Sequence, residues 1–258
     1  MTAELVSERR GVVQLLRINR PEARNSLNRA VIAGLGNGIE VADADPEVRV
    51  VVITGTGDRA FCAGMDLREF TEGAAADASL QKGLEAYQRF IREGCRKPVI
   101  GAANATAVAG GFEVLLACDL VVASDRAVFG LPEVKRGLFP AGGGIQIGRR
   151  IAAAVALELV LTGEAIDAER ALQLGLVNRV VPPGRVLDEA LGIAEVIARN
   201  GPLAVQVAKE LVLFAADAGK ADTWKRQEAL APSVFGSEDA KEGARAFIEK
   251  RDPTWSGR

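Results

Sequence analysis

Short β-branched segments alternate with helix-compatible segments in the first half of the chain, and this alternation restricts the fold. The segments Val12–Ile18 and Val48–Thr54 are rich in Val, Ile and Leu, as expected of buried strands. A helix-like stretch, Leu27–Ala42, separates them, and two more strand-like segments begin at Pro98 and Asp119. Strands that are joined through helices usually pair in parallel, so we expect an α/β fold with largely parallel strands.

The second half of the chain has a different character from about Ile151 onward. It becomes rich in Ala and Leu, and the sequence predicts helices over Val186–Arg199, Leu203–Ala216 and Ala240–Lys250. Their apolar faces require a surface to pack against. The sequence contains neither an internal repeat nor a low-complexity linker between the two halves.

Composition excludes several classes of protein. The 258 residues suffice for one large domain, and the net charge of −2 with no basic tract argues against a nucleic-acid partner. The segment MTAELVSERR lacks the cationic and apolar regions of a secretion signal, and no apolar run reaches the ~18 residues of a membrane span. We therefore expect a cytoplasmic protein with no membrane partner.

The chain contains no histidine, which excludes Ser-His-Asp and Cys-His nucleophiles and an imidazole base. Its three cysteines, Cys62, Cys95 and Cys118, are too few and too widely spaced for a zinc site. We expect reduced thiols and no metal, and we expect Tyr87, the single tyrosine, to serve in packing. Proton transfer must then use carboxylates, Lys, Tyr or water.

Two glycine-containing loops have the composition of oxyanion-binding loops. Glycine lacks a Cβ, so a ligand can reach the main-chain N–H groups near Ala63-Gly64 and Gly110-Gly111. The sequence FEVLLAC after Gly111 is helix-compatible, which would place the N–H groups near Gly110 at a positive helix terminus. A simple turn is the alternative role for these glycines.

Two glutamates accompany these loops. Nearly every neighbour of Glu113 in VAGGFEVLLACDLVVA is apolar. A carboxylate buried there would need either polar partners or a raised pKa, which makes Glu113 a functional candidate. Glu133 follows in the segment Leu131-Pro132-Glu133. Gly142–Gly144 lacks the Lys-Ser or Lys-Thr of a phosphate loop, and we interpret it as close packing at a helix start.

Five segments in this order resemble the crotonase (enoyl-CoA hydratase/isomerase) superfamily, over nearly the whole chain. They are INRPEARNSLN (Ile18–Asn28), Val51–Phe70, Lys97–Ser124, Phe129–Gly144 and Glu238–Trp255. The resemblance implies a spiral of ββα units over residues 1–195. It also implies a C-terminal helical region, residues 196–258, that covers the active site and builds a homotrimer or a dimer of trimers.

The resemblance also implies roles for individual residues. The oxyanion-hole donors would be the backbone N–H groups of Met65 and Gly110, and the hydratase acids would be Glu113 and Glu133, which lie 20 residues apart in sequence as in hydratases of the family. Coenzyme A contacts would fall on Ala63, Asp66, Leu67, Arg68 and Arg24, with the two arginines near phosphates. Candidate walls of an acyl pocket are Leu67, Phe70, Leu84, Pro132, Leu138 and Phe139.

The activity implied is reversible syn addition of water to the 2,3 double bond of a 2-enoyl-CoA, with acyl-CoA as substrate and no cofactor. Family members that isomerise double bonds typically keep only the second acid, so the presence of both favours hydration. An enoyl-CoA isomerase, another acyl-CoA lyase, and a non-catalytic scaffold or RNA-binding relative remain alternatives. Met65 stands where alanine is common, which leaves the acyl group undefined.

Overall fold

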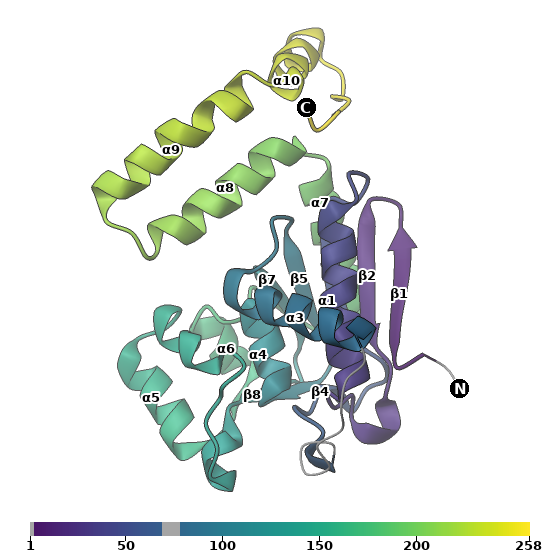
Figure 1. The fold of residues 1–258 in the computed structure, drawn as a ribbon, viewed down its shortest axis with the longest axis vertical. Helices are drawn as coiled ribbons and strands as arrows, with labels where there is room; N and C mark the ends of the chain where they lie inside the picture. The colour runs from purple at the N-terminus through teal and green to yellow at the C-terminus, as the bar shows by residue number, and fades with distance from the viewer. Residues whose placement is uncertain (1–2, 69–77) are drawn as a thin grey trace.

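The computed structural model describes residues 3–68 and 78–258, and Phe70, a candidate acyl-pocket wall, lies outside them. The described chain forms two sheets and a set of covering helices (Figure 1). The first sheet has the strand order β1-β2-β3-β5-β7-β10 and is parallel except for the β1–β2 hairpin. Its strands are β1 (Leu5–Arg10), β2 (Val13–Ile18), β3 (Val50–Gly55), β5 (Val99–Ala103), β7 (Leu120–Ser124) and β10 (Arg179–Val181).

Strand β3 shows why this sheet is buried on both faces. All six of its residues are buried. Val51 and Ile53 pack into the cluster that contains residues of the helices on one face, whereas Val50 and Val52 pack with residues of α7 (Val186–Ala198) on the other. A parallel strand covered on both sides reads as a continuous apolar run, and the predicted segment Val48–Thr54 is confirmed as a strand of this kind.

The second sheet is small and carries the candidate site. Strands β4 (Ala60–Cys62), β6 (Thr106–Val108) and β8 (Val128–Gly130) are parallel neighbours, and β9 (Ile166–Asp167) pairs antiparallel with β8. The register places Cys62 opposite Ala107 and Ala107 opposite Phe129. The carboxyl ends of β4, β6 and β8 therefore lie side by side.

The helices that precede α7 in the chain pack over the sheets. Helix α1 begins at Arg29 rather than at the expected Leu27, because the Asn28 side chain caps it by accepting the Val31 N–H at 2.9 Å. The helices are α1 (Arg29–Ala44), α3 (Ala78–Glu93), α4 (Gly110–Ala117), α5 (Ala153–Thr162) and α6 (Ala168–Gln173). The 3₁₀ turns are Pro21–Ala23, Pro132–Arg136, Gly144–Arg149 and Pro183–Arg185.

The last three helices extend away from the sheets as an arm (Figure 1). They are α8 (Pro202–Ala215), α9 (Lys220–Phe235) and α10 (Glu238–Glu249). Lys209 on α8 ties the arm to the core, because its Nζ bonds the Asp119 carboxylate at 2.6 Å and the Lys97 carbonyl at 3.0 Å. The sequence predicted α8 and α10, but not the more polar α9, which has Pro232 within its last turn.

Helices α1 and α3 approach so closely that glycine is required at their contact. A Cβ on Gly36 would lie 2.1 Å from the carbonyl oxygen of Gly83, and a Cβ on Gly83 would lie 2.6 Å from that of Ala33. Backbone atoms cannot rotate away as a side chain can. This contact therefore fixes the distance between the two helices.

We expect Gly36→Ala to lower the free energy of unfolding by about 1–3 kcal/mol, because overpacking at a backbone contact outweighs the gain in helix propensity. Urea unfolding followed by circular dichroism measures the change. Gly192→Ala is the matched control, since it lies within α7 and its Cβ would meet nothing within 4 Å. That control should gain about 0.5–1 kcal/mol, and equal stability of Gly36→Ala and wild type would contradict the prediction.

Candidate active site

Three parallel strand ends bring the predicted catalytic residues together. Met65 follows β4, Gly110 and Glu113 follow β6, and Glu133 follows β8. Because these strands are neighbours in one sheet, the loops after them share one edge. The carboxyl edge of parallel strands is where α/β proteins generally bind ligands.

The Met65 N–H is directed away from its neighbouring chain segment. Leu27 forms a parallel bridge with Met65, in which the Leu27 N–H donates to the Gly64 carbonyl at 2.8 Å and the Asp66 N–H donates to the Leu27 carbonyl at 2.9 Å. In such a bridge the N–H of Met65 itself points away from Leu27. Among the described residues the Met65 N–H has no hydrogen-bond acceptor.

The Gly110 N–H lies at the start of helix α4. The preceding Ala109 has φ 50° and ψ −131°, a strained conformation for a residue with a side chain, and its carbonyl accepts the N–H groups of Phe112 and Glu113. No described residue accepts the Gly110 N–H. A Cβ on Gly110 would lie 3.7 Å from the Met65 nitrogen, so both donors border one small space at a positive helix terminus.

The Glu113 carboxylate is buried against a glycine loop. Only 6% of the residue is exposed, and its Oε1 accepts the Gly144 N–H at 2.9 Å. A Cβ on Gly142 would lie 2.5 Å from Oε2, and one on Gly144 would lie 3.0 Å from Oε1. The prediction of close packing at this glycine cluster is confirmed, since the 3₁₀ helix Gly144–Arg149 begins there; the sequence had not linked the cluster to Glu113.

Burial raises the pKa of both glutamates. For Glu113, loss of hydration is the largest cause, the Gly144 N–H opposes it, and the negative charge of Glu133 adds to it. For Glu133, loss of hydration outweighs the opposing effects of its own N–H and of Arg136. The Glu133 Oε2 is buried and has no hydrogen-bond partner among the described residues. The site thus holds two interacting acids, one anchored and one with a free oxygen.

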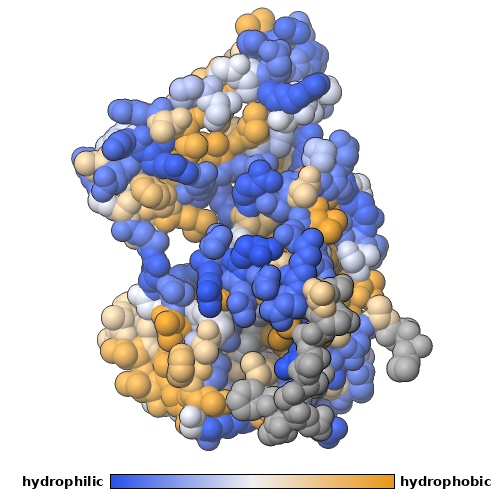
Figure 2. All heavy atoms as spheres, viewed as in Figure 1, coloured by the Kyte–Doolittle hydropathy of each residue, from blue (hydrophilic) through white to orange (hydrophobic). Residues whose placement is uncertain are grey.

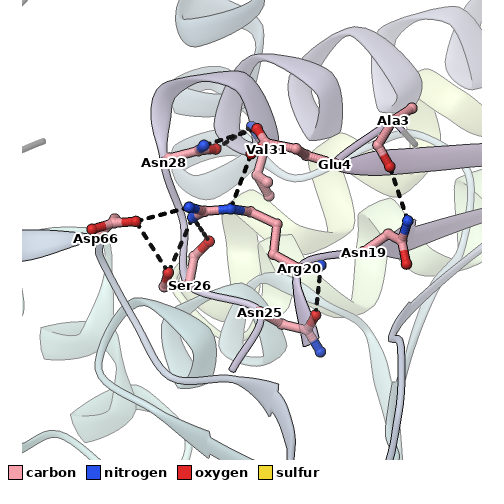
Figure 3. Close-up of polar contacts among 9 residues, drawn as sticks. All are labelled: Ala3, Glu4, Asn19, Arg20, Asn25, Ser26, Asn28, Val31 and Asp66. Atoms are coloured by element: carbon pink, nitrogen blue, oxygen red, sulfur yellow. Dashed lines mark hydrogen bonds and ion pairs between the residues drawn. The ribbon is translucent and has the colours of Figure 1, made fainter. Parts of the chain in front are cut away.

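The predicted coenzyme A residues lie along the same edge. The Ala63 N–H donates to the Arg24 carbonyl at 3.1 Å, which places Arg24 beside the Met65 loop. Arg24, Leu67 and Arg68 are exposed. The Asp66 carboxylate instead accepts bonds from Arg20 and Ser26 (Figure 3). The structure therefore directs this side chain into the protein.

The sequence analysis did not predict the hydrogen bonds that Arg20, Asn25 and Ser26 make next to the Met65 N–H. All three residues lie in the segment INRPEARNSLN. Asn25 is buried; its amide donates to the carbonyls of Thr56 and Ala60 and its oxygen accepts the Arg20 N–H. The concentration of Arg, Asn and Ser in so short a segment was the available signal. These bonds hold residues 20–28 beside the Met65 loop.

The predicted acyl-pocket walls have different environments. Leu138 and Phe139 are exposed, whereas Leu84 and Pro132 are half-buried. Next to the Glu113 carboxylate the structure instead places the glycine loop and Leu131, whose side chain would lie 2.9 Å from a Cβ on Gly144. Apolar groups thus contribute to the surroundings of the anchored acid.

The remaining side chains singled out in the sequence serve in packing. All three cysteines are buried and free, and burial raises the pKa of the Cys62 thiol to about 12. Burial also raises the pKa of Tyr87, whose backbone contacts α1 at Gly36. Within residues 3–68 and 78–258, no helix is long and apolar enough to span a membrane, and no cluster of three metal-ligating side chains occurs.

Comparisons with known proteins identify relatives of this chain. A family model described as enoyl-CoA hydratase/isomerase matches residues 8–258. The carnitinyl-CoA dehydratase of Citrobacter koseri is 39% identical over the full length of both chains, and a probable mitochondrial enoyl-CoA hydratase of Dictyostelium discoideum is 38% identical over 96% of this chain and 89% of its own.

Solved structures give the same result. The crystal structure of a probable enoyl-CoA hydratase/isomerase from Mycobacterium abscessus superposes over all of both chains with a TM-score of 0.91 and 44% identity. The predicted crotonase-like α/β fold is confirmed by this likeness. The chain belongs to the enoyl-CoA hydratase/isomerase family.

Proposed function

We propose that the protein is an enoyl-CoA hydratase that adds water reversibly, in the syn sense, across the 2,3 double bond of a 2-enoyl-CoA thioester. One observation carries this proposal: the buried carboxylate of Glu113 and the half-buried carboxylate of Glu133, whose Oε2 is buried, lie at the same sheet edge as two N–H groups that have no acceptor among the described residues. Isomerisation requires one acid, whereas addition of water requires a base for water and an acid for carbon. The two relatives named above are likewise a hydratase and a dehydratase.

The N–H groups of Met65 and Gly110 would bind the thioester oxygen. When hydroxide adds to C3, negative charge develops on that oxygen, and the two donors with the α4 terminus stabilise it. A single donor of this kind is typically worth ~2.7–4 kcal/mol of transition-state stabilisation. The strained turn at Ala109 supports this role, because strain of this kind collects at functional sites.

The two glutamates would divide the proton transfers. Glu113, anchored as a carboxylate by the Gly144 N–H, takes a proton from water, and the water oxygen bonds to C3. Glu133, whose Oε2 has no partner among the described residues, delivers a proton to C2. The raised pKa of Glu133 favours the protonated form that this step requires. The reaction is redox-neutral and these groups suffice for it, so we propose that acyl-CoA is the substrate and that no cofactor takes part.

We further propose that residues 1–195 form the catalytic core and that residues 196–258 build a homotrimer or a dimer of trimers. Apolar side chains are exposed on α5, where Figure 2 shows an apolar surface, and on the arm: Leu157, Leu161, Val212, Phe247 and Ile248. A cleft of about 640 Å³ also separates α8 from α1 and α3. Assembly would cover such surfaces. The cytoplasmic location expected from the sequence stays a prediction.

We expect Glu113→Gln and Glu133→Gln each to lower hydration of crotonyl-CoA by at least ~10²-fold, with little change in coenzyme A binding, because each removes one proton-transfer group. Absorbance at the enoyl thioester band follows the reaction, and calorimetry measures binding. Near-full activity of Glu113→Gln with an inactive Glu133→Gln would overturn the hydratase proposal in favour of an isomerase. A 3-enoyl-CoA substrate tests that alternative directly.

Glu113→Gln should also change how the stability of the protein depends on pH. Burial raises the pKa of Glu113 above its usual value of 4.5, so the folded state binds more protons than the unfolded state in the range above 4.5. The contribution of Glu113 to wild-type stability must then fall as pH rises through this range. The glutamine side chain in Glu113→Gln does not titrate. The Tm of the variant relative to that of the wild type should therefore increase as pH rises from about 5 to about 7. A constant Tm difference would contradict the raised pKa.

The assembly proposal predicts a trimeric or hexameric mass by light scattering at micromolar concentration. The double variant Val212→Glu/Phe247→Glu, with both changes on the arm, should dissociate the assembly, because charged side chains would be buried at the contact. Val41→Glu is the control, because Val41 on α1 is exposed to a similar degree as Val212 on the arm, 66% against 70%. The control variant should keep the wild-type mass. A monomeric wild type with full activity would refute the proposal.

A further inference from the structure

Arg20 forms a polar network with Glu4, Ser26 and Asp66, the residue that follows Met65 (Figure 3). Its guanidinium bonds the Asp66 carboxylate at 3.0 Å, the Ser26 carbonyl at 2.9 Å and the Ser26 hydroxyl at 3.1 Å. Its Nε also pairs with the Glu4 carboxylate at 3.2 Å. The side chains of Arg20 and Asp66 are only 13% and 16% exposed, so this pair is much less screened than a surface ion pair.

Packing of the Met65 side chain does not explain the orientation of the Met65 N–H. Met65 is 52% exposed and Leu67 is also exposed. The anchored side chain in this short segment is that of Asp66, which is half-buried and bonded to Arg20 and Ser26. Arg20 also holds Ser26, next to the Leu27 that bridges Met65. It thus contacts both strands of the bridge that orients the donor.

Charge gives Arg20 a second effect. Asp66 is the residue after the Met65 donor, so its carboxylate belongs to the same loop as one of the two proposed oxyanion donors. Burial alone would raise the pKa of Asp66, but the Arg20 guanidinium and the Arg68 N–H lower it below its usual range. The carboxylate therefore stays charged at neutral pH. Without a paired cation it would repel the developing oxyanion.

We propose that Arg20 is a positioning residue for the oxyanion hole: its ion pair with Asp66 fixes the Met65 N–H and cancels the charge beside it. This inference rests on the proposed function, since it assumes that Met65 donates to a thioester oxygen. Arg20 does not touch the substrate in this scheme. A guanidinium suits the role because its planar fork reaches Ser26 and Asp66 together, which a lysine ammonium cannot do in the same geometry.

The kinetic test compares Arg20→Gln, Arg20→Lys, Asp66→Asn and the double variant Arg20→Gln/Asp66→Asn. Arg20→Gln should lower kcat for crotonyl-CoA on the order of 10-fold, less than the ~10²–10³ lost with a whole donor, and should leave KM nearly unchanged. Adding Asp66→Asn should restore part of the loss, because it removes the uncancelled carboxylate. Arg20→Lys should be intermediate. A purely structural role predicts a change in Tm with kcat unchanged.

A spectroscopic test is independent of turnover. Isotope-edited infrared spectra of bound butyryl-CoA, which has no double bond to hydrate, report how strongly the hole polarises the thioester carbonyl. Wild-type protein should lower the carbonyl frequency, and Arg20→Gln should reduce this shift. A wild type that shifts the carbonyl but does not hydrate crotonyl-CoA would refute the proposed function and leave the role of Arg20 standing.

Asp119→Asn is the matched control, since it breaks the Lys209 ion pair, whose side chains are 13% and 20% exposed, at the amino end of β7. It should lower the Tm but leave kcat and the carbonyl frequency unchanged. The proposal is overturned if folded Arg20→Gln keeps both wild-type values. It is also overturned if Asp119→Asn lowers kcat equally. If Arg20→Gln does not fold, the proposal is tested with Arg20→Lys and Asp66→Asn, and kcat and the carbonyl frequency are measured for both. Wild-type values of both quantities in both variants would overturn it.

Discussion

The parallel pairing of β4, β6 and β8 is the interaction on which the candidate site depends. Each strand is only three residues long, yet hydrogen bonding in one register forces the three following loops to one edge. The donors and the acids are up to 68 residues apart in sequence, between Met65 and Glu133, and no local preference could bring them together. The chemistry proposed here is thus a consequence of sheet topology.

Local patterns predicted much of the architecture. The buried strand at Val48–Thr54 and the helix after Gly111 were predictable because apolar periodicity and glycine placement act over a few residues. The short strands β4, β6 and β8 and the polar helix α9 carried no comparable pattern. The spiral itself and the roles of Met65, Gly110, Glu113 and Glu133 came from the family resemblance, although glycine placement had already indicated the loop at Gly110 and apolar neighbours had indicated Glu113. What neither source supplied was the set of long-range bonds, such as that between Gly144 and Glu113.

The site concentrates features that oppose folding. Two carboxyl groups interact, one buried and one half-buried. Ala109 adopts a strained backbone conformation, and two backbone N–H groups lack acceptors among the described residues. Each feature costs free energy by itself. The compensating contacts lie nearby: the apolar neighbours of α4, the backbone contact between α1 and α3, and the bonds made by Asn25 and Arg20. Such a trade of stability for a prepared site is common in enzymes.

Because of the bridge between Leu27 and Met65, the position of the Met65 N–H does not depend on the side chain at position 65. The backbone of Met65 is held by its bridge to Leu27, whereas its side chain is half exposed. Replacing that side chain leaves the N–H where it is. Evolution can therefore alter which acyl group is accepted at this position without rebuilding the group that activates it, so selectivity and reactivity are free to diverge independently.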